Sequence, residues 1–198
     1  MRLYIIPSGD TVEERRGLVL GNLSGRLTDD AVAKIHRASS ELHYCKLTGI
    51  ATSTQRHHLT LGNILHRHTD APEECFEKLD DRSMGALHLE SRAGKFREII
   101  REAELDPLYQ PRDGGSIIVT ACNISSWLYS VYSAQPHARI AVITGETAAK
   151  CLIASALGHR AIRSDSSLKP YSITTIEYNP PSVSQLLKYD SDRHLRAA

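Results

Sequence analysis

The 198-residue chain has almost no excess charge, since 24 lysines and arginines balance 23 aspartates and glutamates and leave a formal charge of +1. A broad positive field that attracts nucleic acid or anionic membranes is therefore not expected. No apolar run reaches the roughly 18 residues of a membrane span, and no basic-then-apolar leader begins the chain. We expect a cytoplasmic protein that binds a small molecule and neither nucleic acid nor membrane.

Cysteine pairs are also missing. No Cys-x-x-Cys motif occurs, and three of the four cysteines lie in apolar, periodic segments. We interpret all four as reduced core residues rather than as a disulfide or a metal site. They are Cys45, Cys75, Cys122 and Cys151.

Several motifs of common enzymes and cofactor sites are absent too. No Gly-x-Ser-x-Gly turn occurs, and the glycines at 17, 21 and 25 lack the spacing and the preceding strand of a dinucleotide fingerprint. The histidines at 57, 58, 66 and 68 lack the i, i+4 spacing that places two imidazoles on one helix face. We expect them at the solvent surface, and we predict neither a metal nor a cofactor.

The composition, 41% hydrophobic and 24% charged, predicts one substantial core. We therefore predict a single domain over residues 1–198, with 180–198 as a surface tail after the Pro180-Pro181 pair. Alternating apolar periods predict strands at 2–6, 49–52, 138–144 and 171–178, and helices at 28–45, 55–65, 95–104, 117–131 and 145–158. The glycine at 62 is expected to weaken the second helix.

This alternation predicts a three-layer α/β/α sandwich around a mostly parallel central sheet. A side flap is expected between the strand–helix units, around residues 79–104. In such folds ligands bind at the carboxyl ends of the strands. Three loops are expected there, at residues 7–11, 52–56 and 144–147.

Four segments of the chain follow one known pattern in order. The first is carried by Gly9-Asp10-Thr11, Gly17, Gly21 and Leu27-Thr28. The second, Thr52-Ser53-Thr54-Gln55-Arg56 with Thr60, is similar to a Ser-x-x-x-Arg-x-x-x-Thr motif. The third runs from Leu79 to Leu87 and the fourth from Ser172 to Tyr178. Together they resemble the histidine phosphatase superfamily, which has the phosphoglycerate mutase-like fold.

The resemblance implies a definite site, in which one histidine attacks phosphorus, two arginines and a second histidine neutralise the phosphoryl oxygens, and a carboxylic acid protonates the leaving group. Carried over position by position, the attacking histidine becomes Ser8, the first arginine Pro7 and the second histidine Gly145. The second arginine remains as Arg56, and the acid remains in shortened form as Asp81.

These replacements remove the chemistry of the family. Ser8 has a hydroxyl of very high pKa and no evident base beside it in the sequence, and Pro7 lacks both a guanidinium and a backbone N–H. Gly145 leaves a space where a donor stood, and Glu146 adds a carboxylate at a helix N-terminus that would otherwise favour phosphate. We therefore predict no phosphohistidine and no ordinary phosphatase or mutase turnover.

The ligand-binding candidates are Arg56, Arg82, Ser8, Gly9 and Gly145. Arg56 either binds a phosphate or carboxylate at the strand ends or forms a salt bridge with Asp81 or Glu146. The sequence leaves both interpretations open.

The catalytic candidates are Asp81, Ser8 and Glu146. Asp81 is either a general acid or a capping or solvated carboxylate. Ser8 is a weak candidate nucleophile, since no histidine and acid are evidently placed to complete a triad.

Two classes of function remain open. The first is a degenerate family member that binds a small anionic or phosphorylated molecule, or a protein partner, without turnover. The second is a repurposed enzyme in which Arg56 anchors an anionic substrate while Asp81, Glu146 or Ser8 performs acid–base chemistry. Such chemistry includes isomerisation, elimination and condensation on a phosphorylated or carboxylated metabolite. A homodimer is possible in either case, and the fold alone does not choose between the two classes.

Overall fold

A computed structural model describes residues 1–158 and 167–196 of the chain. Its centre is a six-stranded sheet with the strand order β3-β2-β4-β1-β5-β6. The strands are β1 (Arg2–Pro7), β2 (Gly49–Thr52), β3 (Glu73–Cys75), β4 (Arg139–Thr144), β5 (Ile173–Glu177) and β6 (Gln185–Ser191). Strands β1 to β4 run parallel, and β5 runs antiparallel to its neighbours β1 and β6.

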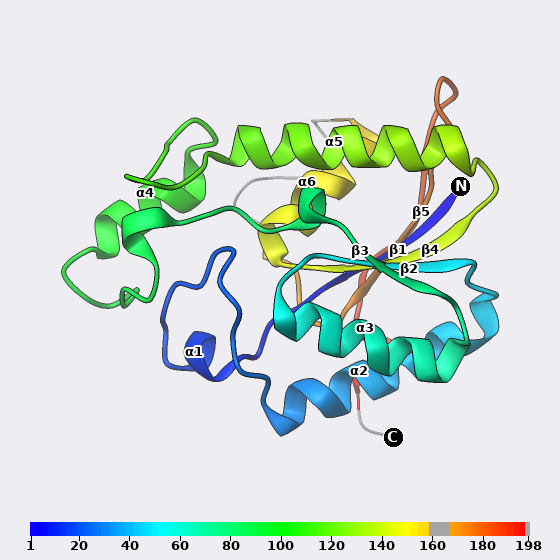
Figure 1. Cartoon of the computed structure of the whole chain (residues 1–198), viewed down its shortest axis with the longest axis horizontal. Coiled ribbons are helices and arrows are strands. Elements are labelled where there is room, and N and C mark those ends of the chain that lie inside the picture. The colour runs from blue at the N-terminus through cyan, green and yellow to red at the C-terminus, as the bar shows by residue number, and fades with distance from the viewer. Residues whose placement is uncertain (159–166, 197–198) are drawn as a thin grey trace.

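Helices cover both faces of this sheet (Figure 1). The α-helices of the described residues are α1 (Val12–Arg15), α2 (Asp29–Leu42), α3 (Arg56–Thr69), α4 (Arg97–Leu105), α5 (Ile117–Ala134) and α6 (Glu146–Leu157). Helices α2 and α3 pack on one face and α5 and α6 on the other. The predicted three-layer α/β/α sandwich with a mostly parallel sheet is confirmed.

The central strands are apolar throughout because both of their faces are covered. In β1, Leu3 and Ile5 join the core under α5 and α6, while Tyr4 and Ile6 join the core above α2 and α3. Side chains of a strand alternate between faces, so four consecutive apolar residues supply both cores. This arrangement places β1 and β4 side by side in the middle of the molecule, with their carboxyl ends at the same edge.

A third, smaller core lies in the region predicted as a side flap. It is built from Val19, Met84, Leu87, Ile100 and Ala103. Helix α4 lies in this region, beyond one end of the sheet and well away from the strands (Figure 1). The flap therefore forms an outer wall near the carboxyl ends of the parallel strands.

Two local predictions differ from the structure. The predicted surface tail contains β6, which is paired with β5 at the edge of the sheet although most of its side chains are exposed. All four cysteines are free, but only Cys151 is buried, because Cys75 lies on edge strand β3 and Cys122 on an exposed part of α5. The apolar period around Cys122 therefore did not indicate burial.

Gly62 has a packing role in α3. A Cβ atom there would lie 2.3 Å from Glu73 Oε1 and 2.5 Å from Thr52 Cγ2, so only glycine allows α3 to approach β2 and β3 this closely. Glycine lowers the helix propensity of α3, and the close packing of the helix on the sheet offsets this loss. In the described parts of the chain, no helix is long and apolar enough to cross a membrane.

Candidate functional site

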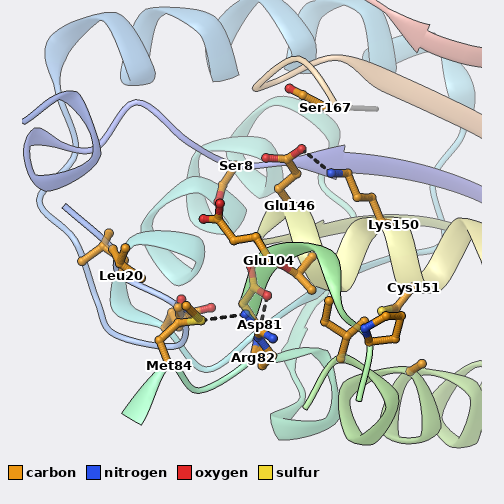
Figure 2. Close-up of a pocket in the computed structure, with 18 of the residues that line it drawn as sticks. Ser8, Leu20, Asp81, Arg82, Met84, Glu104, Glu146, Lys150, Cys151 and Ser167 are labelled. Atoms are coloured by element: carbon orange, nitrogen blue, oxygen red, sulfur yellow. Dashed lines mark hydrogen bonds and ion pairs between the residues drawn. The ribbon is translucent and has the colours of Figure 1, made fainter. Parts of the chain in front are cut away.

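A cavity of about 1220 Å³ lies at the carboxyl ends of β1, β2 and β4. Ser8 follows β1, His57 and His58 follow β2, and Gly145 follows β4, and all four line it. Figure 2 shows Ser8, Asp81 and Glu146 around this space, with Lys150 beside Glu146. The parallel sheet therefore brings segments that are far apart in the sequence to one site, as expected for this class of fold.

Ser8 continues the pairing of the two central strands past the end of β1. Its backbone N–H donates to the carbonyl of Thr144, with 2.8 Å between the two atoms. This bond fixes the backbone of Ser8 against β4, and the residue is 8% exposed. The hydroxyl is thus held at the cavity wall by the sheet itself.

A histidine lies directly beside this serine. His58 Nε2 is hydrogen-bonded to Ser8 Oγ, and His58 Nδ1 lies 2.5 Å from Ser53 Oγ. The ring of His58 is fully buried, and His57 is 6% exposed. The expectation that these two histidines are at the surface, and that Ser8 has no base beside it, is therefore wrong.

The inward rotation of α3 explains the error. Its buried residues include His58, Leu61 and Leu65, which are spaced by three and four and so share one helix face. The spacing of the histidines from one another does not reveal this burial, whereas their spacing from the apolar residues of the same helix does. The spacing of His58 from Leu61 and Leu65 was therefore the signal that could have predicted its burial.

The protons in this cluster can be assigned from the hydrogen-bond network. Both N–H groups of Gln55 donate to the carbonyls of Gly21 and Leu23, at 3.1 Å each, so its Oε1 is left to accept from Ser53 Oγ at 3.0 Å. Ser53 has one proton and donates it there. His58 Nδ1–H must then donate to Ser53 Oγ, which leaves His58 Nε2 unprotonated and able to accept the proton of Ser8.

His57 is oriented by a different contact. Its Nδ1 accepts the backbone N–H of Gly25 at 3.2 Å, so the proton of the neutral ring resides on Nε2. Burial lowers the pKa of His57 to about 4, against a smaller opposing effect of Glu13. Burial, aided by His57, lowers the pKa of His58 well below its ordinary value. Both rings are therefore neutral at pH 7.

Asp81 occupies the place that was predicted from the sequence to be vacant. A Cβ atom on Gly145 would lie 2.0 Å from Asp81 Oδ2, so the carboxyl group fills the space next to the glycine. Burial raises the pKa of Asp81 to about 6, although hydrogen bonds from the backbone of Arg82, at 2.7 Å, and from Thr147 favour the charged form. Gly145 is thus not a hole but the contact point for this carboxyl group.

Two other carboxylates of the cavity are paired with cations, while Glu14 accepts the backbone N–H and the hydroxyl of Thr11 at 3.1 and 2.8 Å. Glu146 Oε1 lies 2.8 Å from Lys150 Nζ and also accepts the backbone N–H of Leu168 at 3.0 Å. Arg92 forms an ion pair with Glu104. These charges are therefore largely neutralised within the wall of the cavity.

Arg82 holds the flap in place. Its Nη1 donates to the carbonyl of Ala103 at 2.6 Å, and its Nη2 lies 2.9 Å from Met84 Sδ. The side chain is buried, and its Nε is enclosed with no acceptor among the described residues. Arg82 lines the cavity, and these two contacts tie its guanidinium to the flap core.

Two predicted ligand-binding residues lie outside the cavity wall. Arg56 is exposed, and its backbone N–H donates to Ser24 Oγ at 2.9 Å. Gly9 packs against Pro170, whose Cγ would lie 2.9 Å from an added Cβ, and its carbonyl accepts the hydroxyl of Tyr171 at 2.7 Å. The structure thus brings Ser8, Asp81 and Gly145 together without these two residues.

Among residues 1–158 and 167–196, no group of three or more histidine, cysteine, aspartate or glutamate side chains could hold a metal ion. The imidazoles of the cavity are engaged with serine hydroxyls and with a backbone amide instead.

Solved structures share this arrangement of strands and helices. Bacillus stearothermophilus YhfR is 18% identical, with a TM-score of 0.87 over 98% of this chain and 99% of that protein. A mycobacterial glucosyl-3-phosphoglycerate phosphatase in complex with VO3 is 14% identical, with a TM-score of 0.84 over 96% and 99%. The alpha-ribazole phosphatase of Shigella flexneri is 15% identical, with a TM-score of 0.81 over 96% and 98%.

At these identities the likeness establishes a common fold. No curated protein matches the sequence of the chain. A family model, however, matches residues 3–190, which is nearly the whole sequence. The chain therefore belongs to the histidine phosphatase superfamily, branch 1.

Proposed function

We propose that this chain is a degenerate histidine phosphatase-like protein that binds a small molecule in the cavity at the strand ends and forms no phosphohistidine. The observation that supports this most directly is the pair of positions at which the family pattern has histidines. One is Ser8, and the other is Gly145, whose neighbouring space is filled by Asp81. An imidazole at position 145 would collide with that carboxyl group.

The two histidines that do line the cavity are poor substitutes for the lost nucleophile. Both nitrogens of His58 are engaged by serine hydroxyls, and the ring is fully buried. In His57, Nδ1 accepts a backbone N–H and Nε2 carries the proton. Attack on phosphorus requires a free, unprotonated nitrogen, and neither ring offers one.

The charges of the cavity support the same conclusion. Transfer of a phosphoryl group depends almost entirely on cations that neutralise its oxygens. Here Lys150 and Arg92 are paired with carboxylates, and Arg82 is bound to a backbone carbonyl. We infer that this cavity stabilises a dianionic transition state poorly.

The same charges bear on the ligand. The anionic or phosphorylated ligand stays a prediction, because it depended on Arg56 as an anchor and Arg56 is exposed. The cavity better suits a ligand with an apolar part and few formal charges, since much of its wall is aliphatic. The aliphatic residues are Val19, Leu20, Met84, Leu105, Ile117, Ile118, Ala121 and Ala154. The protein partner and the homodimer stay predictions as well.

One observation favours the alternative of a repurposed enzyme. The pKa of Asp81 is raised to about 6, so a fraction of this acid is protonated near neutral pH and could donate a proton. Glu146 forms an ion pair with Lys150 instead. Asp81 is therefore the acid we retain from the predicted set.

Binding can be tested by thermal shift with p-nitrophenyl phosphate, butyrate and methyl butyrate. A ligand that binds the native state raises the melting temperature by mass action. Ala154 lines the cavity on α6, so Ala154→Trp should fill it and abolish the shift, whereas Ala134→Trp at the exposed end of α5 should preserve it. A shift that persists in Ala154→Trp would place the ligand elsewhere, and no shift with any probe would refute binding of these classes.

Phosphohistidine chemistry can be tested separately with acetyl phosphate and p-nitrophenyl phosphate. We expect no acid-labile phosphate on the protein and no hydrolysis above the spontaneous rate. Acid-labile phosphate that maps to His57 or His58 would refute the proposal.

A further inference from the structure

We propose that Ser8 and His58 form a nucleophile and general base that cleave neutral carboxylic esters through an acyl-Ser8 intermediate. This inference rests on the proposed function, because it uses the same cavity, and it adds a reaction and a substrate class. It concerns a hydroxyl and an imidazole that the family chemistry does not use at these positions.

The hydrogen bonds run in the direction that activates a serine. Gln55, fixed by two backbone carbonyls, accepts from Ser53, and Ser53 accepts from His58 Nδ1–H. His58 Nε2 is left as the acceptor for the hydroxyl of Ser8. A serine, a base and a group that orients the base are the parts of a nucleophilic site, and they are recognised by geometry rather than by chain order. Ser53 and Gln55 act here as positioning residues.

His57 supplies the hydrogen-bond donor that such a site needs to stabilise the oxyanion formed during attack. It lines the same cavity, its ring centroid lies 4.1 Å from that of His58, and its Nε2 carries a proton in the neutral ring. A neutral imidazole N–H in a water-poor site can donate to an oxyanion without the cost of burying a cation. We assign this donor role to His57.

The charges of the cavity wall favour a carboxylic ester over a phosphate ester as the substrate. An acyl transfer develops one negative charge, which one or two neutral donors can stabilise, whereas a phosphoryl group brings two charges that require cations. Among residues 1–158 and 167–196, the cations that line this cavity are bound to carboxylates or to the backbone, and part of the wall is aliphatic. The site therefore favours a neutral ester with a short aliphatic acyl chain.

The reaction balances without a further reactant except water. Ser8 Oγ attacks the carbonyl carbon while its proton passes to His58 Nε2, and the oxyanion accepts from His57 Nε2–H. Collapse breaks the bond to the leaving oxygen, which takes the proton from His58 and departs as the alcohol. Water then attacks the acyl-serine with His58 as base, and the second collapse releases the carboxylic acid and returns the proton to Ser8.

This base differs from that of a strong serine hydrolase. No carboxylate contacts His58 among the described residues, since Ser53 stands where a triad would have an acid. The imidazolium that forms during attack is thus poorly stabilised, and loss of the acid in such a triad typically costs about 10⁴ in rate. We expect slow turnover, with acylation that is easier to detect than steady-state hydrolysis.

The test is covalent labelling with p-nitrophenyl acetate, p-nitrophenyl butyrate and a fluorophosphonate probe, followed by mass spectrometry of the intact protein and its peptides. We expect one adduct, on Ser8, that is absent in Ser8→Ala. Ser130 is the matched control, because it is exposed on α5 outside the cavity lining and its Oγ donates to the carbonyl of Ser126 at 2.8 Å. Ser130→Ala should label at the wild-type rate.

The base is tested by rates. His58→Gln should slow labelling at least about 100-fold, the usual range for loss of a general base. If His58→Gln fails to fold, Ser53→Ala keeps the imidazole and removes only the group that orients it. We expect about tenfold slower labelling in Ser53→Ala, with rescue in Ser53→Thr. Equal rates in wild type and Ser53→Ala, an adduct elsewhere than Ser8, or no adduct would each refute the inference.

This outcome is separable from that of the proposed function. Ser8→Ala keeps the shape of the cavity, so it should still show the thermal shift with methyl butyrate while it loses all labelling. Binding without labelling in the wild type refutes only the ester chemistry. Labelling of Ser8 that Ala154→Trp does not affect refutes the proposed ligand cavity instead.

Discussion

The residues that follow β1 and β2 give one part of the cavity neutral polar groups, whereas the residues around the start of α6 give another part formal charges. We call the first the histidine wall; it consists of Ser8, Gln55, His57 and His58, with Ser53 hydrogen-bonded to His58 and Gln55. We call the second the carboxylate wall; it consists of Asp81, Glu146 and Lys150. The two walls line one cavity, but their buried polar groups are stabilised in different ways.

In the histidine wall, burial is tolerated because the side chains of Ser8, Gln55 and His58 are hydrogen-bonded and no ring is charged. In the carboxylate wall, charge is tolerated because a cation or a set of donors lies next to each carboxylate. Glu146 has Lys150, and Asp81 has the backbone of Arg82 and Thr147. The difference suggests that reactivity belongs to the first wall and proton donation to the second.

The largest effect on this comparison is expected from a substitution at Gly145 that displaces the Asp81 carboxyl group. In Gly145→Ala, the methyl group would lie 2.0 Å from Asp81 Oδ2 and 2.9 Å from Asp81 Cβ, so the carboxyl group must move away from Thr147. We expect a loss of up to about 3 kcal/mol in the free energy of unfolding, as is usual for an overpacked site. Urea unfolding of the purified protein measures it.

Gly49→Ala is the matched control for this variant. A Cβ atom at Gly49 would meet only Pro72 O, at 4.0 Å, so we expect no loss and at most a small gain from the less flexible unfolded chain. Equal stabilities of Gly145→Ala and Gly49→Ala would show that Asp81 does not fill the space beside Gly145.

Acidification should change the contributions of the two walls to the free energy of unfolding in opposite directions. His57 has a pKa of about 4 when folded, against an ordinary value of 6.5, so the unfolded chain binds more protons between these values and acid favours unfolding. From pH 7 to pH 5 we expect His57 to account for a loss of about 2 kcal/mol in the free energy of unfolding. Urea unfolding at pH 5, 6 and 7 measures this slope.

Asp81 should act in the opposite sense. Its folded pKa of about 6 lies above the ordinary value of 3.8, so the folded chain binds more protons between these values and gains about 1 kcal/mol on the same acidification. His57→Gln should therefore flatten the acid slope and Asp81→Asn should steepen it. If both variants change the acid slope in the same direction, the lowered pKa of His57 and the raised pKa of Asp81 would be contradicted.

The smallest effect is expected at Arg56, which the family pattern would place in the site. Because Arg56 is exposed and outside both walls, Arg56→Ala should change the free energy of unfolding by less than about 0.5 kcal/mol. It should also leave any thermal shift with p-nitrophenyl phosphate or butyrate unchanged. Loss of such a shift in Arg56→Ala would restore the anion anchor predicted from the sequence.

Local patterns were sufficient for the central strands and the main helices, but not for the edge strands β3 and β6. The apolar run at 139–144, the Thr28 cap of α2 and the four-three spacing in α5 each predicted their element, because they reflect burial and capping within a few residues. Gly62 and the cysteines show where such patterns fail. Whether a residue faces a neighbour or solvent depends on which element packs beside it.

The site was less predictable for the same reason. The register of the family pattern placed Arg56 in the site, but the rotation of α3 directs the next two residues inward instead. A shift of one residue on a helix turns a side chain by about 100°. Sequence spacing near the start of a helix therefore did not decide which side chain lines the cavity.

By itself, the sequence determined the alternation of strands and helices, the mostly parallel sheet, and the absence of histidine at positions 8 and 145. Only the tertiary structure decided that His58 meets Ser8 across 50 residues of sequence and that Asp81 fills the space beside Gly145. Periodicity arises from local burial and is visible in one segment at a time. A contact between distant segments depends on strand order and helix rotation, which are set by the packing of the whole chain.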